Sequence, residues 1–180
     1  MNAGRKPSLR LFFALWPDDA TRARLAELQA HVHGKLTHYD NLHITLAFLG
    51  EQPADLLPVL RALLDRQPRL DIVLTLDRLG YFRRKRIAWA GPHAIPDALH
   101  ELVHNLRQEL TSEAVTFDQR AEFKPHATLA RDADAPSDIA FDPIVWHANR
   151  IVLVQSITQA DGVHYKVIAE QEALTPDEDG

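Results

Sequence analysis

Residues 41–47 read NLHITLA, and residues 124–130 read KPHATLA. Aligned on their histidines, the two stretches share His, Thr, Leu and Ala at matching offsets. The histidines, His43 and His126, are separated by close to half of the 180-residue chain. Two similar lobes, each contributing one strand, would explain this internal repeat.

Side chains alternate between the two faces of a β-strand, so each copy predicts one apolar and one polar face. The apolar side chains are expected to face a core: Leu42, Ile44, Leu46 and Phe48 in the first copy, Ala127 and Leu129 in the second. The opposite face then presents one imidazole and one hydroxyl per strand, His43 with Thr45 and His126 with Thr128. If the lobes pack side by side, the two pairs converge on one cleft.

The rest of the chain alternates strand and helix patterns. Apolar spacing predicts helices at 17–34, 54–66 and 96–110, and strands at 8–16, 41–49, 70–79, 87–90, 123–130, 151–157 and 164–169. Residues 80–86 are expected at a hairpin tip and residues 132–142 in a polar loop, while Asp161-Gly162 would turn a final hairpin. Hairpins outnumber strand–helix–strand crossovers, which favours an α+β fold with mostly antiparallel sheets.

Composition limits the possible chemistry. Hydrophobic residues make up 46% of the chain, enough for the core of one domain over residues 1–180, with a disordered acidic tail at 176–180. The absence of cysteine excludes disulfides, thiolate metal sites and cysteine nucleophiles. The net charge of −5 argues against non-specific binding of long nucleic acid. The apolar run 11–16 is too short for a signal peptide or a membrane span, so we expect a cytoplasmic protein.

Two histidine–threonine pairs suit phosphate ester chemistry. Histidine serves as acid or base near neutral pH because its unperturbed pKa is about 6.5. Imidazoles on opposite sides of a phosphorus atom allow in-line attack by water, and we therefore expect neither a metal nor another cofactor. The hydroxyls of Thr45 and Thr128 can donate to the non-bridging oxygens. Arg131 follows the second motif and is either a cationic contact to the phosphate or an exposed loop arginine.

These motifs resemble the 2H phosphoesterase superfamily, and within it the RNA 2′,3′-cyclic phosphodiesterases, also called 2′-5′ RNA ligases. The similarity runs through nearly the whole chain, in residues 10–17 (RLFFALWP), 41–50, 79–82, 87–89, 123–131, 153–156 and 162–165. Gln155 stands where the family often has glutamate.

The resemblance implies two pseudo-symmetric lobes of antiparallel sheet with outer helices, flanking a central cleft. It also implies that His43 is the proton donor and His126 the proton acceptor when a terminal 2′,3′-cyclic phosphate on RNA opens to a 2′-phosphate. The resemblance also implies a reversible 2′-5′ RNA ligase activity. We expect RNA ends or small cyclic nucleotides as substrate, and a monomer without an obligate protein partner. The alternative of another class is a catalytically weak nucleotide-binding module of the same fold.

Two other stretches invite a functional interpretation. His100 and His104 lie in HELVH, a pattern typical of zinc peptidases, but they fall on the polar side of a predicted helix, where a solvated face is expected instead. Residues 83–86, RRKR, form a basic run at the hairpin tip. It is either a solvated turn or an RNA contact made by Arg83, Arg84 and Arg86, with stacking by the neighbouring Tyr81 and Phe82.

Overall fold

The computed structural model describes residues 4, 6–69, 71–119 and 122–171, so the predicted acidic tail at 176–180 lies outside the described residues. The elements follow in chain order as β1 (Ser8–Leu15), α1 (Asp19–Leu28), η1 (Gln29–His31), β2 (Lys35–Leu36), η2 (Tyr39–Asn41), β3 (Ile44–Pro53), η3 (Ala54–Leu56), α2 (Leu57–Asp65), β4 (Val73–Leu76), β5 (Arg78–Phe82), β6 (Ile87–Gly91), α3 (Asp97–Ser112), β7 (Ala127–Arg131), β8 (Ile144–His147), β9 (Ile151–Gln159) and β10 (Gly162–Glu170).

The main sheet is antiparallel throughout and, in the described part of the chain, contains eight strands. Its order is β10-β9-β1-β3-β7-β6-β5, with β2 also paired to β7. The two halves, β10-β9-β1-β3 and β7-β6-β5, meet where Ile44 of β3 pairs with Ala127 of β7. The predicted α+β fold with antiparallel sheets is therefore confirmed, and its two lobes share one sheet joined at a narrow seam.

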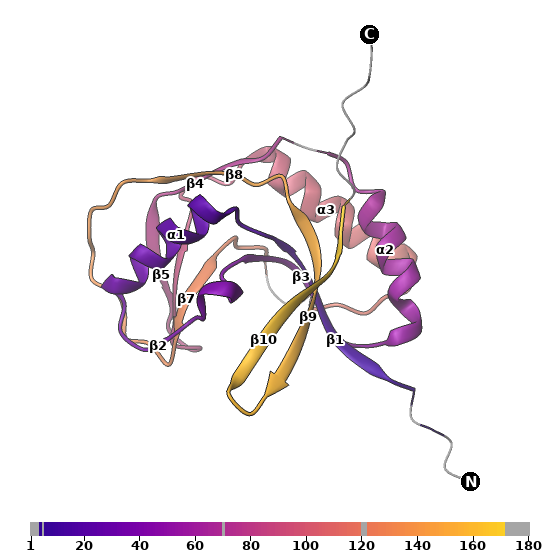
Figure 1. Ribbon diagram of the computed structural model, residues 1–180. Coiled ribbons are helices and arrows are strands. Elements are labelled where there is room, and N and C mark those ends of the chain that lie inside the picture. The colour runs from indigo at the N-terminus through magenta and orange to yellow at the C-terminus, as the bar shows by residue number, and fades with distance from the viewer. Residues whose placement is uncertain (1–3, 5, 70, 120–121, 172–180) are drawn as a thin grey trace.

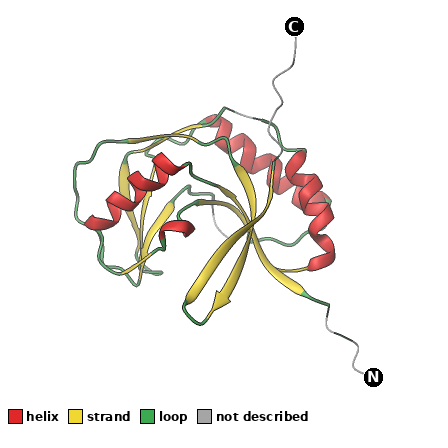
Figure 2. Ribbon diagram, viewed as in Figure 1, coloured by secondary structure: helices red, strands yellow, loops and turns green. Residues whose placement is uncertain are grey.

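The helices cover the two halves of the sheet separately. α2 contacts β9 and β10, and α3 contacts β3 and α2, whereas α1 contacts β7 and β8. Figures 1 and 2 show α2 and α3 side by side on the right of the view, with α1 on the left over the other half. No described helix is long and apolar enough to cross a membrane.

Alternation along β1 divides the apolar side chains between two clusters. Leu11, Phe13 and Leu15 are fully buried in the main core, which also takes up the buried stripe of α3 (Leu99, Leu102, Val103, Leu106 and Leu110). The opposite face of β1 contributes to a second, smaller cluster, which we call the aromatic cluster: Phe12, Ala14, Trp16, Val152 and Val154, with Phe48, Tyr165 and Val167 packed at its margin.

Several predicted boundaries change in the structure. The expected strand 70–79 is two strands in different sheets, β4 and β5, because the chain breaks at Asp77, whose carboxylate accepts hydrogen bonds from the backbone N–H and ring Nδ1 of His93. The partner of β4 is β8, a strand that the sequence analysis did not predict. Pro58 lies in the first turn of α2, where its missing N–H costs no helical hydrogen bond.

Candidate active site

His43 and His126 lie at the seam between the two half-sheets. Each immediately precedes its strand, β3 or β7, rather than lying within it as predicted. The residues that follow them, Ile44 and Ala127, form the pair that joins the two halves. The seam thus brings the two histidines together, and the charge of His126 is near enough to lower the pKa of His43.

Both motifs carry a β-bulge at the leucine that follows the threonine. The pairing of β3 with β1 skips Leu46, directly after Thr45, and the pairing of β7 with β6 skips Leu129, directly after Thr128. The internal repeat therefore extends from sequence to backbone geometry. The bulge on β3 also shifts the alternation of side chains, so Phe48 packs on the aromatic cluster and the expectation that it faces the main core was wrong.

The two imidazoles are oriented in the same way by the main chain. His43 Nδ1 lies 2.6 Å from the carbonyl oxygen of Asn41, and His126 Nδ1 lies 2.7 Å from that of Lys124. A carbonyl oxygen only accepts, so each Nδ1 carries the proton and each neutral ring keeps an unprotonated Nε2. The hydroxyl of Thr45 lies 2.9 Å from His43 Nε2 and donates to it when the ring is neutral.

Aromatic side chains surround both half-buried imidazoles, more completely around His43. Its ring centroid lies 4.9 Å from that of Phe12, 5.9 Å from the stacked ring of Trp16 and 5.3 Å from the edge-on ring of Tyr165. His126 has two such neighbours: Phe82, edge-on at 4.8 Å, and Trp89 at 6.1 Å. The second half of the sheet therefore repeats the phenylalanine and the tryptophan but not the tyrosine.

Burial lowers the pKa of both histidines. The pKa of His43 falls to about 4, mainly because an imidazolium loses its hydration among the aromatic rings, with smaller contributions from the charges of His126, Arg131 and Arg22. The pKa of His126 is also lowered, first by burial and then by the charges of Lys85, Arg131 and Lys124. Both rings are hence neutral near pH 7 in the free protein, and an anion between them would favour protonation.

Cations gather mainly on the side of His126. Lys124 Nζ lies 5.7 Å from the ring centre of Phe82 and 5.9 Å from that of Trp89. Arg131 ends β7 as an exposed residue, and its charge acts on both histidines. Together with Lys85, these groups make the seam positive in a protein whose net charge is −5.

The basic run occupies the turn between β5 and β6 with all four side chains exposed. Arg86 forms an ion pair with Asp134 at 3.6 Å. The two aromatic residues before the turn differ in role: Phe82 contacts His126, whereas the hydroxyl of Tyr81 donates to the carbonyl of Ala133 at 2.7 Å and its ring packs against the main core.

His100 and His104 both project from the exposed side of α3, as its apolar spacing indicates. His104 borders a hollow of about 510 Å³ on α3 together with Arg107 and Thr111, away from the seam. Among the described residues, no three His, Cys, Asp or Glu side chains gather in an arrangement that could hold a metal ion.

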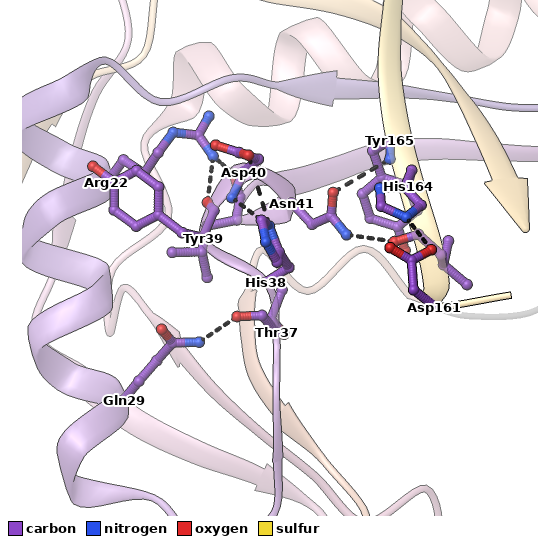
Figure 3. Close-up of polar contacts among 12 residues, drawn as sticks. Arg22, Gln29, Thr37, His38, Tyr39, Asp40, Asn41, Asp161, His164 and Tyr165 are labelled. Atoms are coloured by element: carbon purple, nitrogen blue, oxygen red, sulfur yellow. Dashed lines mark hydrogen bonds and ion pairs between the residues drawn. The ribbon is translucent and has the colours of Figure 1, made fainter. Parts of the chain in front are cut away.

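Sequence reasoning missed the groups that support His43 from distant parts of the chain. Arg22 of α1 is buried, and its Nη1 donates to the carbonyls of Tyr39 at 2.7 Å and Leu42 at 3.3 Å, on either side of Asn41 (Figure 3). Asn41 and Tyr165 are linked across 124 residues. The available signal was the position of Arg22 in one row with Leu25 and Leu28, where a charged residue is seldom buried without a partner.

Known proteins are similar to this chain in both sequence and fold. Residues 17–158 match the model of the 2′-5′ RNA ligase superfamily. The RNA 2′,3′-cyclic phosphodiesterase of Escherichia coli K12 is 35% identical over 134 residues, which cover 69% of this chain and 72% of that protein. The protein of the same name from Thermus thermophilus is 33% identical over 177 residues, which cover 89% of this chain and 88% of that protein. The crystal structure of E. coli LigT in apo form aligns with a TM-score of 0.78 and 29% identity, over 91% of this chain and 96% of that chain. The chain belongs to the 2′-5′ RNA ligase superfamily.

Proposed function

We propose that the protein is an RNA 2′,3′-cyclic phosphodiesterase that opens a terminal cyclic phosphate to a 2′-phosphate by acid–base catalysis with two histidines. The observation that carries this proposal is the pair of imidazoles at the seam, each with Nδ1 bound to a carbonyl two residues earlier. Similar proteins are named for this activity, and a structure of E. coli LigT contains 3′-AMP.

The proposed reaction is a direct in-line displacement at phosphorus. Nε2 of His126 takes a proton from water while the water oxygen bonds to phosphorus, and the P–O3′ bond breaks as Nε2–H of His43 delivers its proton to O3′. The product carries a free 3′-hydroxyl and a 2′-phosphate. With the 5′-hydroxyl of a second RNA in place of water as the nucleophile, the same bond changes would form a 2′-5′ linkage and leave a free 3′-hydroxyl; cleavage of that linkage is the reverse step.

The enclosure of His43 suits the donor role once substrate is bound. A low pKa makes its imidazolium a strong acid, and the negative charge of the phosphate supplies the stabilisation that lets the ring take up a proton. A protonated Nε2 can no longer accept a hydrogen bond from Thr45. The hydroxyl of Thr45 is then released to donate to a non-bridging oxygen, so protonation of His43 and phosphate binding support each other.

Thr128 and Arg131 fit the corresponding roles on the other side. Thr128 is half-buried, and its backbone pairs with that of Trp89, beside His126. We assign its hydroxyl to a non-bridging oxygen and the guanidinium of Arg131 to the charge of the phosphate. For longer RNA, we assign Arg83, Arg84 and Arg86 to the phosphates beyond the terminal nucleotide.

The direct test is turnover of cytidine 2′,3′-cyclic phosphate, with the product isomer identified by ³¹P NMR. We expect cytidine 2′-phosphate, and His43→Ala or His126→Ala should each lower kcat/KM by about 10²–10⁴, the usual range for one general acid or base. Formation of the 3′-phosphate would contradict the proposed cleavage of P–O3′. Binding without turnover would support a nucleotide-binding module instead.

A second substrate separates the two histidine roles. In an aryl phosphodiester with 4-nitrophenolate as leaving group, the departing oxygen needs little protonation, so His43→Ala should be largely rescued. His126→Ala should stay impaired because water still needs a base. If His126→Ala is the variant rescued, the two roles are reversed.

A further inference from the structure

Asn41 connects the segment before His43 to the edge of the main sheet. It is the last residue of η2 and only 9% exposed. Its Nδ2 donates to the carbonyl of Val163 at 2.9 Å, and its Oδ1 accepts from the N–H of Tyr165 at 3.3 Å (Figure 3). Because β10 ends the strand order, this side-chain amide binds the edge of β10 that faces away from β9, as a neighbouring strand would.

The same residue contacts His43 through its main chain. The carbonyl of Asn41 accepts the Nδ1–H of His43 at 2.6 Å. The amide group also fixes the backbone of Tyr165, whose ring stands edge-on to the imidazole at 5.3 Å. Asn41 therefore contacts His43 through its carbonyl and, through its side chain, the backbone of Tyr165, whose ring lies beside the imidazole.

The second motif has no equivalent amide. There the accepting carbonyl belongs to Lys124, an exposed residue followed by Pro125, whose ring restricts the backbone. In the first motif, Arg22 of α1 binds the carbonyls on either side of Asn41, whereas the amide group of Asn41 binds β10. We call the two hydrogen bonds from the Asn41 amide group to β10 the Asn41 clamp, and it acts on the segment before His43 and not on the segment before His126.

We propose that Asn41 is a positioning residue for the proton-donating imidazole of His43. It holds η2 against β10, which keeps the proton on Nδ1 and directs Nε2 to the leaving oxygen. The proposal rests on the proposed function for its kinetic consequence, but not for its structural one. Without the amide group, η2 is released from β10, the Nδ1 bond to the Asn41 carbonyl loosens, and proton donation suffers more than substrate binding.

The test is Asn41→Ala, compared with Gln52→Ala as a matched control. Gln52 is also buried and also links backbone segments, donating to the carbonyls of Leu49 and Thr116 at 2.9 Å each, but near the far end of β3. On cytidine 2′,3′-cyclic phosphate, we expect Asn41→Ala to lower kcat about 10- to 100-fold, the scale of a misplacement near 1 Å, with KM nearly unchanged. On the 4-nitrophenyl ester the loss should nearly disappear. Gln52→Ala should show no such dependence on the leaving group.

The tautomer of His43 provides a readout that does not need activity. In ¹⁵N NMR of the folded protein, wild type should show a single tautomer protonated at Nδ1, and Asn41→Ala a mixture of both. Equal losses on both esters with an unchanged tautomer would overturn the proposal and leave Asn41 a structural residue. If wild type fails to turn over the cyclic substrate, the proposed function fails, while the tautomer still decides the role of Asn41. Where Asn41→Ala does not fold, Asn41→Asp, which keeps only the acceptor for Tyr165, should show a smaller tautomer change in the same direction, and its absence counts against the proposal.

Discussion

Anion binding at the seam should raise the pKa of His43 by several units. In the free protein this pKa is about 4, because aromatic rings replace the water around the imidazole. Donation of a proton near pH 7 requires a shift of about 3 units, which corresponds to roughly 4 kcal/mol. A unit negative charge about 4 Å from the imidazolium supplies about that energy at an effective dielectric constant near 20. The shift is therefore within reach of a single bound phosphate.

Sulfate is a suitable probe because its charge does not change near neutral pH. The pKa of His43, followed by NMR and identified by the signal lost in His43→Gln, should move from about 4 towards 7 at saturating sulfate. The sign follows from linkage: the bound form holds the extra proton, so affinity is higher at low pH. Between roughly pH 5 and 7, sulfate affinity should fall about tenfold per pH unit.

The variants make this prediction decisive. In His43→Gln the tenfold fall per pH unit should disappear, leaving only the pH dependence that His126 contributes. If the tenfold fall persists there and disappears in His126→Gln, the proton enters at His126 and the donor role belongs to that residue. If sulfate binds and moves neither pKa, the coupling between anion and imidazole is absent and the reasoning is wrong.

Three further predictions concern other parts of the molecule. Turnover should be unchanged by EDTA, because two imidazoles supply acid and base; activity lost in EDTA and restored by zinc would instead support the HELVH motif of α3. Replacing Arg83, Arg84 and Arg86 by Gln should raise KM for oligonucleotides and flatten its salt dependence, with little effect on the cyclic mononucleotide; equal effects on both substrates would place the turn in the chemistry. Gly80→Ala should destabilise the protein by about 1–3 kcal/mol in urea denaturation, because the added Cβ would overlap the buried Trp89 ring; an unchanged midpoint would show that the ring can move aside.

The sequence predicts those features that depend on residues close together in the chain. The alternation around each histidine is local, so His43, Thr45, His126 and Thr128 could be predicted as candidate site residues from two heptapeptides. The amphipathic stripe of α3 is equally local and predicted both its buried face and the exposure of His100.

Other features depend on partners far along the chain. The amide group of Asn41 binds the carbonyl of Val163 in β10, 122 residues later in the chain. Arg22 binds the carbonyl of Tyr39 only when η2 packs against α1. Leu46 is an extra residue only because the pairing of β3 with β1 skips it. Simple alternation cannot foresee this bulge and therefore misplaced Phe48. The division of residues 70–79 into β4 and β5 depends in the same way on β8 and on His93, neither of which a local pattern reveals.

The two motifs are alike where orientation matters and differ where proton affinity matters. Both histidines bind a carbonyl through Nδ1, and both motifs have a bulge after the threonine. Acid–base catalysis, however, needs one protonated and one neutral ring at the same pH, and different surroundings determine which ring takes which role. Around His43 the chain adds a third aromatic ring, Thr45 at Nε2 and the Asn41 clamp, whereas around His126 it adds exposed cations. In the proposed mechanism, the repeated strand supplies the geometry for in-line attack, and the unequal surroundings allow the two copies to take opposite roles.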